Sequence, residues 1–115
     1  MSNHIAFIGV GNMGNPMANQ LVKAGQNVKV FDVSPDVIEI AKQSGLNVIS
    51  SMEELLEGAT TVISMLPEGK HVRSLYLGDN GILKKIPKDC LIIDCSTIDI
   101  ETSLALGSEA KKIGI

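Results

Sequence analysis

Apolar positions along the chain fall into two patterns that follow each other in turn. Short apolar runs predict strands at residues 4–10, 27–33, 46–49, 61–66 and 90–94, and the nearly continuous first run is typical of a central strand buried on both faces. Between these runs the apolar residues recur every three or four positions, which predicts helices at 13–24, 35–44, from 51 onward, 69–76 and 99–113. This alternation predicts a Rossmann-type doubly wound parallel sheet with three α/β/α layers, in which the sixth and later strands are lacking.

The starts of two predicted helices carry residues with capping preferences. Ser34 is expected as an N-cap, with Pro35 at the first helical position. Ser51 and Glu54 have the spacing of a capping box. Both signals support the helix limits given by the apolar spacing.

Residues 9–14 form a glycine-rich turn, G-x-G-x-x-G, between the first strand and the first helix. We expect Gly9 to permit the tight turn, Gly11 to let the backbone approach a pyrophosphate, and Gly14 to let helix and sheet pack closely. Free N–H groups at the helix start would stabilise the phosphate charge. Asp32 ends the second strand 18 residues after Gly14, where a carboxylate can bind ribose hydroxyls. The motif in this context predicts a dinucleotide site.

The charge of Asp32 predicts which dinucleotide binds. A carboxylate repels the 2′-phosphate of NADP, and residues 33–35 include no arginine to bind it, so NAD is the expected cofactor. Two alternatives stay open at this point. One is a tight strand-to-helix turn beside a solvated Asp32, and the other is the glycine loop of a methyltransferase.

Two further strand ends carry candidate residues, because ligands of doubly wound sheets bind at the carboxyl ends of strands. Leu66 and Pro67 follow the fourth run as an apolar wall of the site, unless Pro67 only ends the strand. Ser96 and Thr97 follow the fifth run, where their hydroxyls either bind a nicotinamide ribose or substrate carboxylate or cap the next helix. His71 is either a cofactor contact or an exposed helix residue.

Composition narrows the class of protein. Hydrophobic residues make up 44% of the chain, only three residues are aromatic, and the formal net charge is −3. This balance disfavours nucleic-acid partners, and no apolar run approaches the roughly 18–20 residues of a membrane helix. Two cysteines suggest neither a disulfide framework nor a zinc site, so we expect no metal and a reducing, cytoplasmic compartment. A location in the mitochondrial matrix would require a removed transit peptide.

Three strings resemble the β-hydroxyacid dehydrogenase family: residues 7–18 (FIGVGNMGNPMA), 65–67 (MLP) and 94–99 (DCSTID). The likeness covers essentially the whole chain, and its first string is the most specific. It implies the NAD-dependent oxidation of 3-hydroxyisobutyrate to methylmalonate semialdehyde, a step of valine breakdown. It also implies that residues 1–115 are the NAD-binding domain of a longer, homo-oligomeric enzyme with a helical second domain. The chain departs from the family at Ile100, where a proline is common.

The resemblance also assigns roles to single residues. The cofactor contacts that it implies are Gly9, Val10, Gly11, Asn12, Met13, Gly14, Asp32, Leu66, Pro67, His71 and Thr97. Ser96 and Thr97 would also contact the small hydroxyacid substrate. No residue receives a catalytic role, because the family's catalytic lysine is expected beyond Ile115. Two alternatives are an NAD(P)-dependent reductase of another small β-hydroxyacid, such as tartronate semialdehyde, and a stand-alone NAD-binding sensor module.

Overall fold

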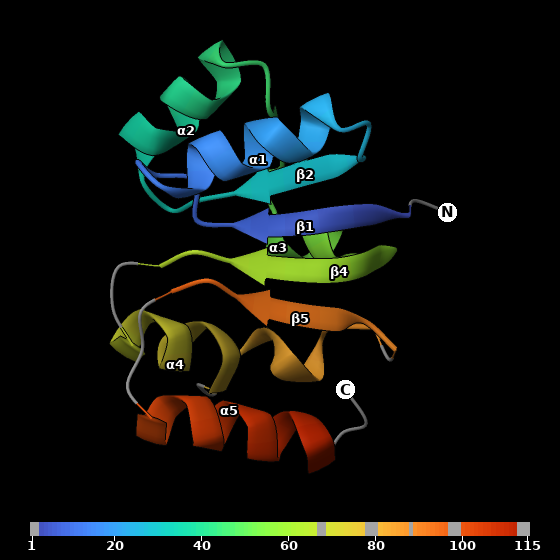
Figure 1. The fold of residues 1–115 in the computed structure, drawn as a ribbon, viewed down its shortest axis with the longest axis vertical. Helices are drawn as coiled ribbons and strands as arrows, with labels where there is room; N and C mark the ends of the chain where they lie inside the picture. Colours follow the sequence, from blue (N-terminus) through green and yellow to red (C-terminus); the bar gives the residue numbers. More distant parts are fainter. Residues whose placement is uncertain (1–2, 67–68, 78–80, 88, 97–99, 113–115) are drawn as a thin grey trace.

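Five parallel strands form a single sheet in the order β3-β2-β1-β4-β5 (Figure 1). The computed structural model describes residues 3–66, 69–77, 81–87, 89–96 and 100–112. The strands are β1 (His4–Ile8), β2 (Val28–Phe31), β3 (Asn47–Val48), β4 (Ala59–Ser64) and β5 (Leu91–Asp94). The helices are α1 (Gly14–Lys23), α2 (Pro35–Gln43), α3 (Met52–Leu56), α4 (Gly69–Leu77), α5 (Ile100–Lys112) and the short 3₁₀ helix η1 (Ile82–Lys84). The strand order reverses between β1 and β4, so a crevice is expected where these two strands end.

Helices cover both faces of the sheet, which confirms the three-layer α/β/α arrangement of a Rossmann-type fold. On one face α1 and α2 pack over fully buried Phe7, which lies between Val30 and Ile63 of the neighbouring strands. On the other face α3, α4 and α5 pack around Ala6 and Val62. Figure 1 shows β1, β2, β4 and β5 pointing toward the same edge of the molecule. The two apolar layers therefore place the ends of these strands side by side.

Four of the five strands end earlier than their apolar runs predict, and two of these, β1 and β4, border the crevice. The first run continues to Val10, but β1 ends at Ile8 because Gly9 adopts a φ of +93° and turns the chain away. The fourth run predicts a strand at 61–66, whereas β4 spans Ala59–Ser64. The backbone N–H of Leu66 does not pair with a neighbouring strand. It donates instead to Ser96 Oγ, just past the end of β5. Past β4, Met65 and Leu66 line the crevice, whereas the side chain of Val10, past β1, is buried in the core.

The helix starts that Pro35 and Ser51 predict are confirmed, but the predicted capping role of Ser34 is wrong. Pro35 is the first residue of α2, and Ser51 Oγ accepts a hydrogen bond from Glu54 N at 3.4 Å. Ser34 occupies the N-cap position of α2, but its side chain forms no capping hydrogen bond. Its backbone N–H donates to Asp32 Oδ1 at 2.9 Å. The start of α2 is therefore tied to the end of β2 by the aspartate rather than by the serine.

Candidate functional site

Three glycines shape the turn between β1 and α1. Gly9 has a φ of +93°, and a Cβ there would lie 2.3 Å from Met65 O. A Cβ at Gly14 would lie 1.9 Å from Gly9 O, so α1 begins in direct contact with the end of β1. By contrast, a Cβ at Gly11 would meet nothing within 4 Å. The fold therefore requires glycine at 9 and 14, whereas Gly11 borders open space that a ligand can enter.

The N-terminus of α1 reaches this space without a neutralising group. Met13 stands at the N-cap position and forms no side-chain capping hydrogen bond, and the first turn holds no acidic residue. The N–H groups of a first helical turn lack partners within the helix, and the helix dipole adds positive potential. This end of α1 is therefore suited to stabilise a phosphate group.

Asp32 lies at the end of β2, beside the glycine turn. Its Oδ2 accepts a hydrogen bond from Val10 N at 3.0 Å, and its Oδ1 accepts one from Ser34 N at 2.9 Å. These bonds hold the half-buried carboxylate in one orientation. Each oxygen keeps a further lone pair, so the group can still accept hydrogen bonds from two neighbouring hydroxyls.

Two adjoining cavities lie along the strand ends. The larger, of about 420 Å³, is lined by Gly9, Gly11, Asn12, Met13, Gly14, Asp32, Val33, Ser34, Val37, Met65, Leu66 and His71. The smaller, of about 230 Å³, is lined by Ile8, Gly9, Phe31, Asp32, Val33, Leu66, His71, Ser74 and Leu75. Because Gly9, Asp32, Val33, Leu66 and His71 line both, the cavities form one connected cleft. The cleft runs from the glycine turn toward α4 and is mainly apolar, apart from Asp32 and a few side-chain hydroxyl, amide and imidazole groups.

A chain of hydrogen bonds joins the ends of β4 and β5. Asp94 Oδ1 accepts from Ser64 Oγ at 2.9 Å and from Ser96 N at 3.2 Å. The Tyr76 hydroxyl lies 2.7 Å from Ser64 Oγ, and Ser96 Oγ accepts from Leu66 N at 2.6 Å. Burial raises the pKa of Tyr76 well above its usual value, so the phenol stays protonated. The segment that places Leu66 at the cleft is thus held in position by residues at the end of β5.

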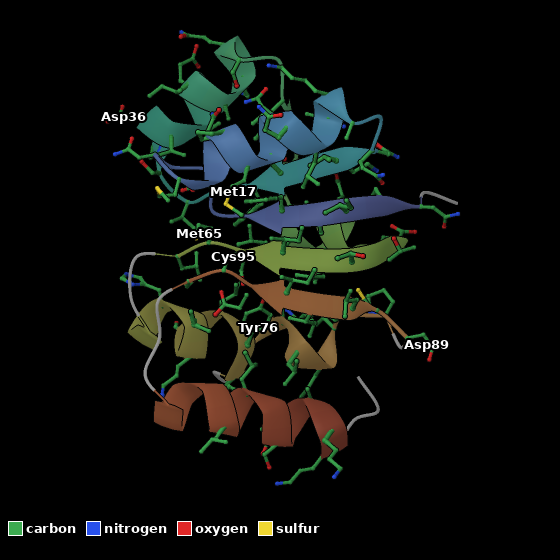
Figure 2. All side chains as sticks on the ribbon, in the orientation of Figure 1. Met17, Asp36, Met65, Tyr76, Asp89 and Cys95 are labelled. Carbon is green, nitrogen blue, oxygen red and sulfur yellow. The ribbon has the colours of Figure 1, made fainter. Side chains whose placement is uncertain are left out.

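The backbone pairing of these strands continues one residue past their ends. Cys95 N donates to Ser64 O at 2.8 Å, and Met65 N donates to Ile8 O at 2.9 Å. Figure 2 shows Met65 and Cys95 at this edge of the sheet, with Tyr76 reaching up from α4. The residues that follow β4 and β5 therefore start from neighbouring, fixed positions.

The structure gathers most of the predicted site residues in one place. Those that line the cleft are Gly9, Gly11, Asn12, Met13, Gly14, Asp32, Leu66 and His71. Val10 contributes its backbone N–H to Asp32, while its side chain is buried in the core. Ser96 is not part of the cleft lining, and its hydroxyl oxygen bonds to Leu66 N. Pro67 and Thr97 lie outside the described residues.

Several residues that sequence reasoning did not select also line the cleft: Ile8, Phe31, Val33, Ser34, Val37, Met65, Ser74 and Leu75. Val33 directly follows Asp32 and is 85% exposed, an unusual position for a valine that ends an apolar run. Ser74 and Leu75 follow His71 by three and four positions, so they share its helix face. Helical spacing from His71 was the signal that could have found them.

The described residues of the cleft offer groups suited to binding. In the part of the chain that the structure describes, no group of three or more His, Cys, Asp or Glu side chains could hold a metal ion. Nor is any described helix both long and apolar enough to cross a bilayer.

Comparison with known proteins identifies the family. Residues 4–115 match the family described as the NAD binding domain of 6-phosphogluconate dehydrogenase. The chain belongs to that family. This NAD-binding domain is 48% identical, over 111 residues, to the 3-hydroxyisobutyrate dehydrogenase of Pseudomonas aeruginosa, covering 96% of this chain and 37% of that protein. It is 40% identical, over 111 residues and with the same coverage of 96% and 37%, to the NAD-dependent L-serine dehydrogenase of the same bacterium.

A solved structure agrees with these relationships. The Mycobacterium tuberculosis 3-hydroxyisobutyrate dehydrogenase, determined with L-serine, superposes with a TM-score of 0.87 at 38% identity, covering 99% of this chain and 38% of that one. The homologues confirm the resemblance to hydroxyacid dehydrogenases, which are oxidoreductases, and the structure confirms the fold of the NAD-binding domain. The chain spans a little over a third of the length of these relatives.

Proposed function

We propose that this chain is the cofactor-binding domain of an NAD-dependent dehydrogenase that oxidises 3-hydroxyisobutyrate to methylmalonate semialdehyde in valine breakdown. The main support for this proposal is the Asp32 carboxylate, which lines the cleft beside the glycine turn. It is held there by hydrogen bonds from Val10 N and Ser34 N. Such a carboxylate suits an adenosine ribose with two free hydroxyls. The 48% identity to a 3-hydroxyisobutyrate dehydrogenase supports the choice of substrate.

The described residues fit NAD at three points. The N–H groups at the start of α1 would hold the pyrophosphate, and the open space at Gly11 permits its close approach. Asp32 would accept hydrogen bonds from the adenosine ribose. Val33, Leu66 and Leu75 bound the smaller cavity with apolar surface, which suits the adenine ring.

The domain's task in this reaction is to bind and orient. When bound, NAD supplies the acceptor for the hydride that leaves the hydroxyl-bearing carbon. The proton of the substrate hydroxyl needs a base, and none of the cleft residues is placed for that role by the family motif. We therefore propose that the chain is part of a longer enzyme whose second domain supplies the base. We also propose that this enzyme is homo-oligomeric and cytoplasmic. Ser96 and Thr97 would lie on the substrate side of the cleft.

Asp32 is the reason to propose NAD rather than NADP. A 2′-phosphate in place of the ribose hydroxyl would bring negative charge against the carboxylate. Residues 33–35 (Val-Ser-Pro) provide no cation to offset it. Both backbone N–H partners of Asp32 are internal to the domain, so the carboxylate cannot turn away without losing them.

L-serine is the second candidate substrate. A relative 40% identical to this chain is named NAD-dependent L-serine dehydrogenase. Serine is itself a β-hydroxyacid that carries an amino group, so both candidates present a hydroxyl and a carboxylate at the same separation. The difference between them lies beside the carboxylate, at the carbon that carries methyl or ammonium.

Two measurements test the proposal. Calorimetric titration of the chain should give a Kd for NAD about tenfold or more below that for NADP, and equal or tighter binding of NADP contradicts the cofactor assignment. Steady-state assays of the longer enzyme should give the highest kcat/KM with 3-hydroxyisobutyrate. A higher value with L-serine makes serine the substrate. The 115-residue chain alone should show no measurable turnover with either.

A further inference from the structure

In the hydrogen bonds at the ends of β4 and β5, the donor and the acceptor of each bond can be assigned. Ser64 Oγ donates its single proton to Asp94 Oδ1 at 2.9 Å. Ser64 Oγ must then be the acceptor in its 2.7 Å contact with Tyr76, so the phenol donates. The raised pKa of Tyr76 agrees with a phenol that keeps its proton. Ser64 is fully buried and Tyr76 is 2% exposed, so solvent cannot replace either bond at low cost.

Asp94 Oδ1 is also linked to the wall of the cleft, through hydrogen bonds made by Ser96. Ser96 N donates to Asp94 Oδ1 at 3.2 Å, and Ser96 Oγ accepts from Leu66 N at 2.6 Å. Leu66 lines both cavities of the cleft, and its Cδ2 lies 3.1 Å from the place that a Cβ of Gly9 would take. Leu66 is therefore pinned between the glycine turn on one side and the end of β5 on the other.

We propose that Asp94 and Ser96 are positioning residues for the cofactor, which hold Leu66 in place on the wall of the nucleotide cleft, and that Ser64 and Tyr76 anchor Asp94 for this purpose. Tyr76 lines neither cavity of the cleft, so its effect on the cofactor passes through Ser64 and Asp94. The proposal rests on the function proposed above, because Leu66 bounds a nucleotide only if the cleft binds one.

Asp94 performs this task with one of its two oxygens. Oδ1 accepts both hydrogen bonds, whereas the buried Oδ2 has no partner among the described residues. The negative charge itself is therefore not required for positioning. Asparagine can present the same acceptor oxygen to Ser64 and Ser96, and alanine cannot.

The test compares NAD affinity and thermal stability in a set of variants of the chain. Asp94→Ala, Ser96→Ala and Tyr76→Phe should each raise the Kd for NAD by about five- to tenfold, measured by calorimetry well below the melting temperature. Asp94→Asn should keep the Kd within about twofold of the unmodified chain. The matched control is Ser51→Ala, which removes a hydroxyl that caps α3 outside the cleft. It should lower the melting temperature and leave the Kd unchanged.

Each result bears on the proposal. Unchanged NAD affinity in Ser96→Ala and Tyr76→Phe, with only a lower melting temperature, would show a purely structural role and overturn it. Equal losses of affinity in Asp94→Asn and Asp94→Ala would overturn it too, because they would assign the effect to the charge. If Asp94→Ala does not fold, Ser96→Ala and Tyr76→Phe still decide. An unmodified chain that binds no NAD overturns the proposed function first, and this inference with it.

Discussion

Asp32 Oδ2 accepts a hydrogen bond from Val10 N at 3.0 Å, which joins the end of β2 to the glycine turn after β1. The side chain of Val10 is buried in the core, so its N–H cannot move without disturbing the packing. One carboxylate thus belongs both to the fold and to the proposed cofactor site. Substitutions at Asp32 are expected to affect both.

Asp32→Asn should weaken the fold and change the cofactor preference. An amide presents one acceptor oxygen, so either Val10 N or Ser34 N loses its partner, which should cost about 1–2 kcal/mol of unfolding free energy. Loss of the charge should raise the Kd for NAD by about tenfold and narrow the gap between NAD and NADP. Urea denaturation and calorimetry with both dinucleotides measure these effects. Asp36→Asn, an exposed carboxylate labelled in Figure 2, is the control and should leave the ratio of the two Kd values unchanged.

Gly14→Ala should destabilise the chain strongly. Its methyl group would lie 1.9 Å from Gly9 O, so α1 would have to move away from β1, at a cost of about 3 kcal/mol or more. Gly107→Ala in α5 is the matched control, because a Cβ there meets nothing within 4 Å and alanine favours a helix. We expect it to add about 0.5–1 kcal/mol of stability. Urea midpoints that fall equally in both variants would contradict the contact at Gly14.

Gly11→Ala should separate binding from stability. The added methyl group enters open space, so the unfolding free energy should stay within about 0.5 kcal/mol of the unmodified chain. The same methyl group would stand where the pyrophosphate approaches, and we expect the Kd for NAD to rise by about tenfold or more. Calorimetry and urea denaturation on the same sample measure both. An unchanged Kd would place the pyrophosphate elsewhere.

Stability should fall as the solution becomes alkaline. Burial raises the pKa of Tyr76 and of Cys90 in the folded chain, whereas the unfolded chain ionises them near their usual pKa values of about 10 and about 9. Their contribution to stability is complete below these values and is lost as the pH rises above them, because the unfolded chain then binds fewer protons. Urea denaturation between about pH 7 and pH 11 measures the slope.

Tyr76→Phe provides the control for this pH dependence, because it removes one of the two groups and should make the decline above about pH 10 shallower. Tyr76 is the only tyrosine and the chain has no tryptophan, so tyrosinate absorbance reports this residue alone. We expect that absorbance only where the chain unfolds. Ionisation of Tyr76 in the folded chain near its usual pKa would contradict the buried hydrogen bond to Ser64.

The strand cores and the glycine turn were predictable from the sequence because their signals are local. An apolar run identifies the strand that holds Phe7, and a glycine with positive φ follows it at Gly9. The strand ends were less predictable. Whether Leu66 N pairs with a neighbouring strand or with the Ser96 hydroxyl depends on a segment 30 residues away. Periodicity carries no information about such a partner.

The site was predictable to a similar extent, and for similar reasons. The motif predicted Asp32 at the glycine turn, and the structure places the two side by side. It did not predict that Asp32 would also hold the backbone N–H groups of Val10 and Ser34, nor that the Ser34 side chain would form no capping hydrogen bond at α2. Ser96 was selected for a substrate, and its hydroxyl oxygen bonds to Leu66 N. Spacing selected the residue types, whereas packing decided which atoms remain available to a ligand.

The carbonyl oxygens of Met65 and Gly9 lie so close to Gly9 and Gly14 that neither position has room for a Cβ, and this close packing leaves the glycine turn with little freedom of its own. A loop that is ordered in advance loses little conformational entropy when its ligand arrives. Stiffening this turn should therefore add little affinity. Capture of a phosphate at this end of the cleft should depend on diffusion and electrostatic attraction, without a slow closing step.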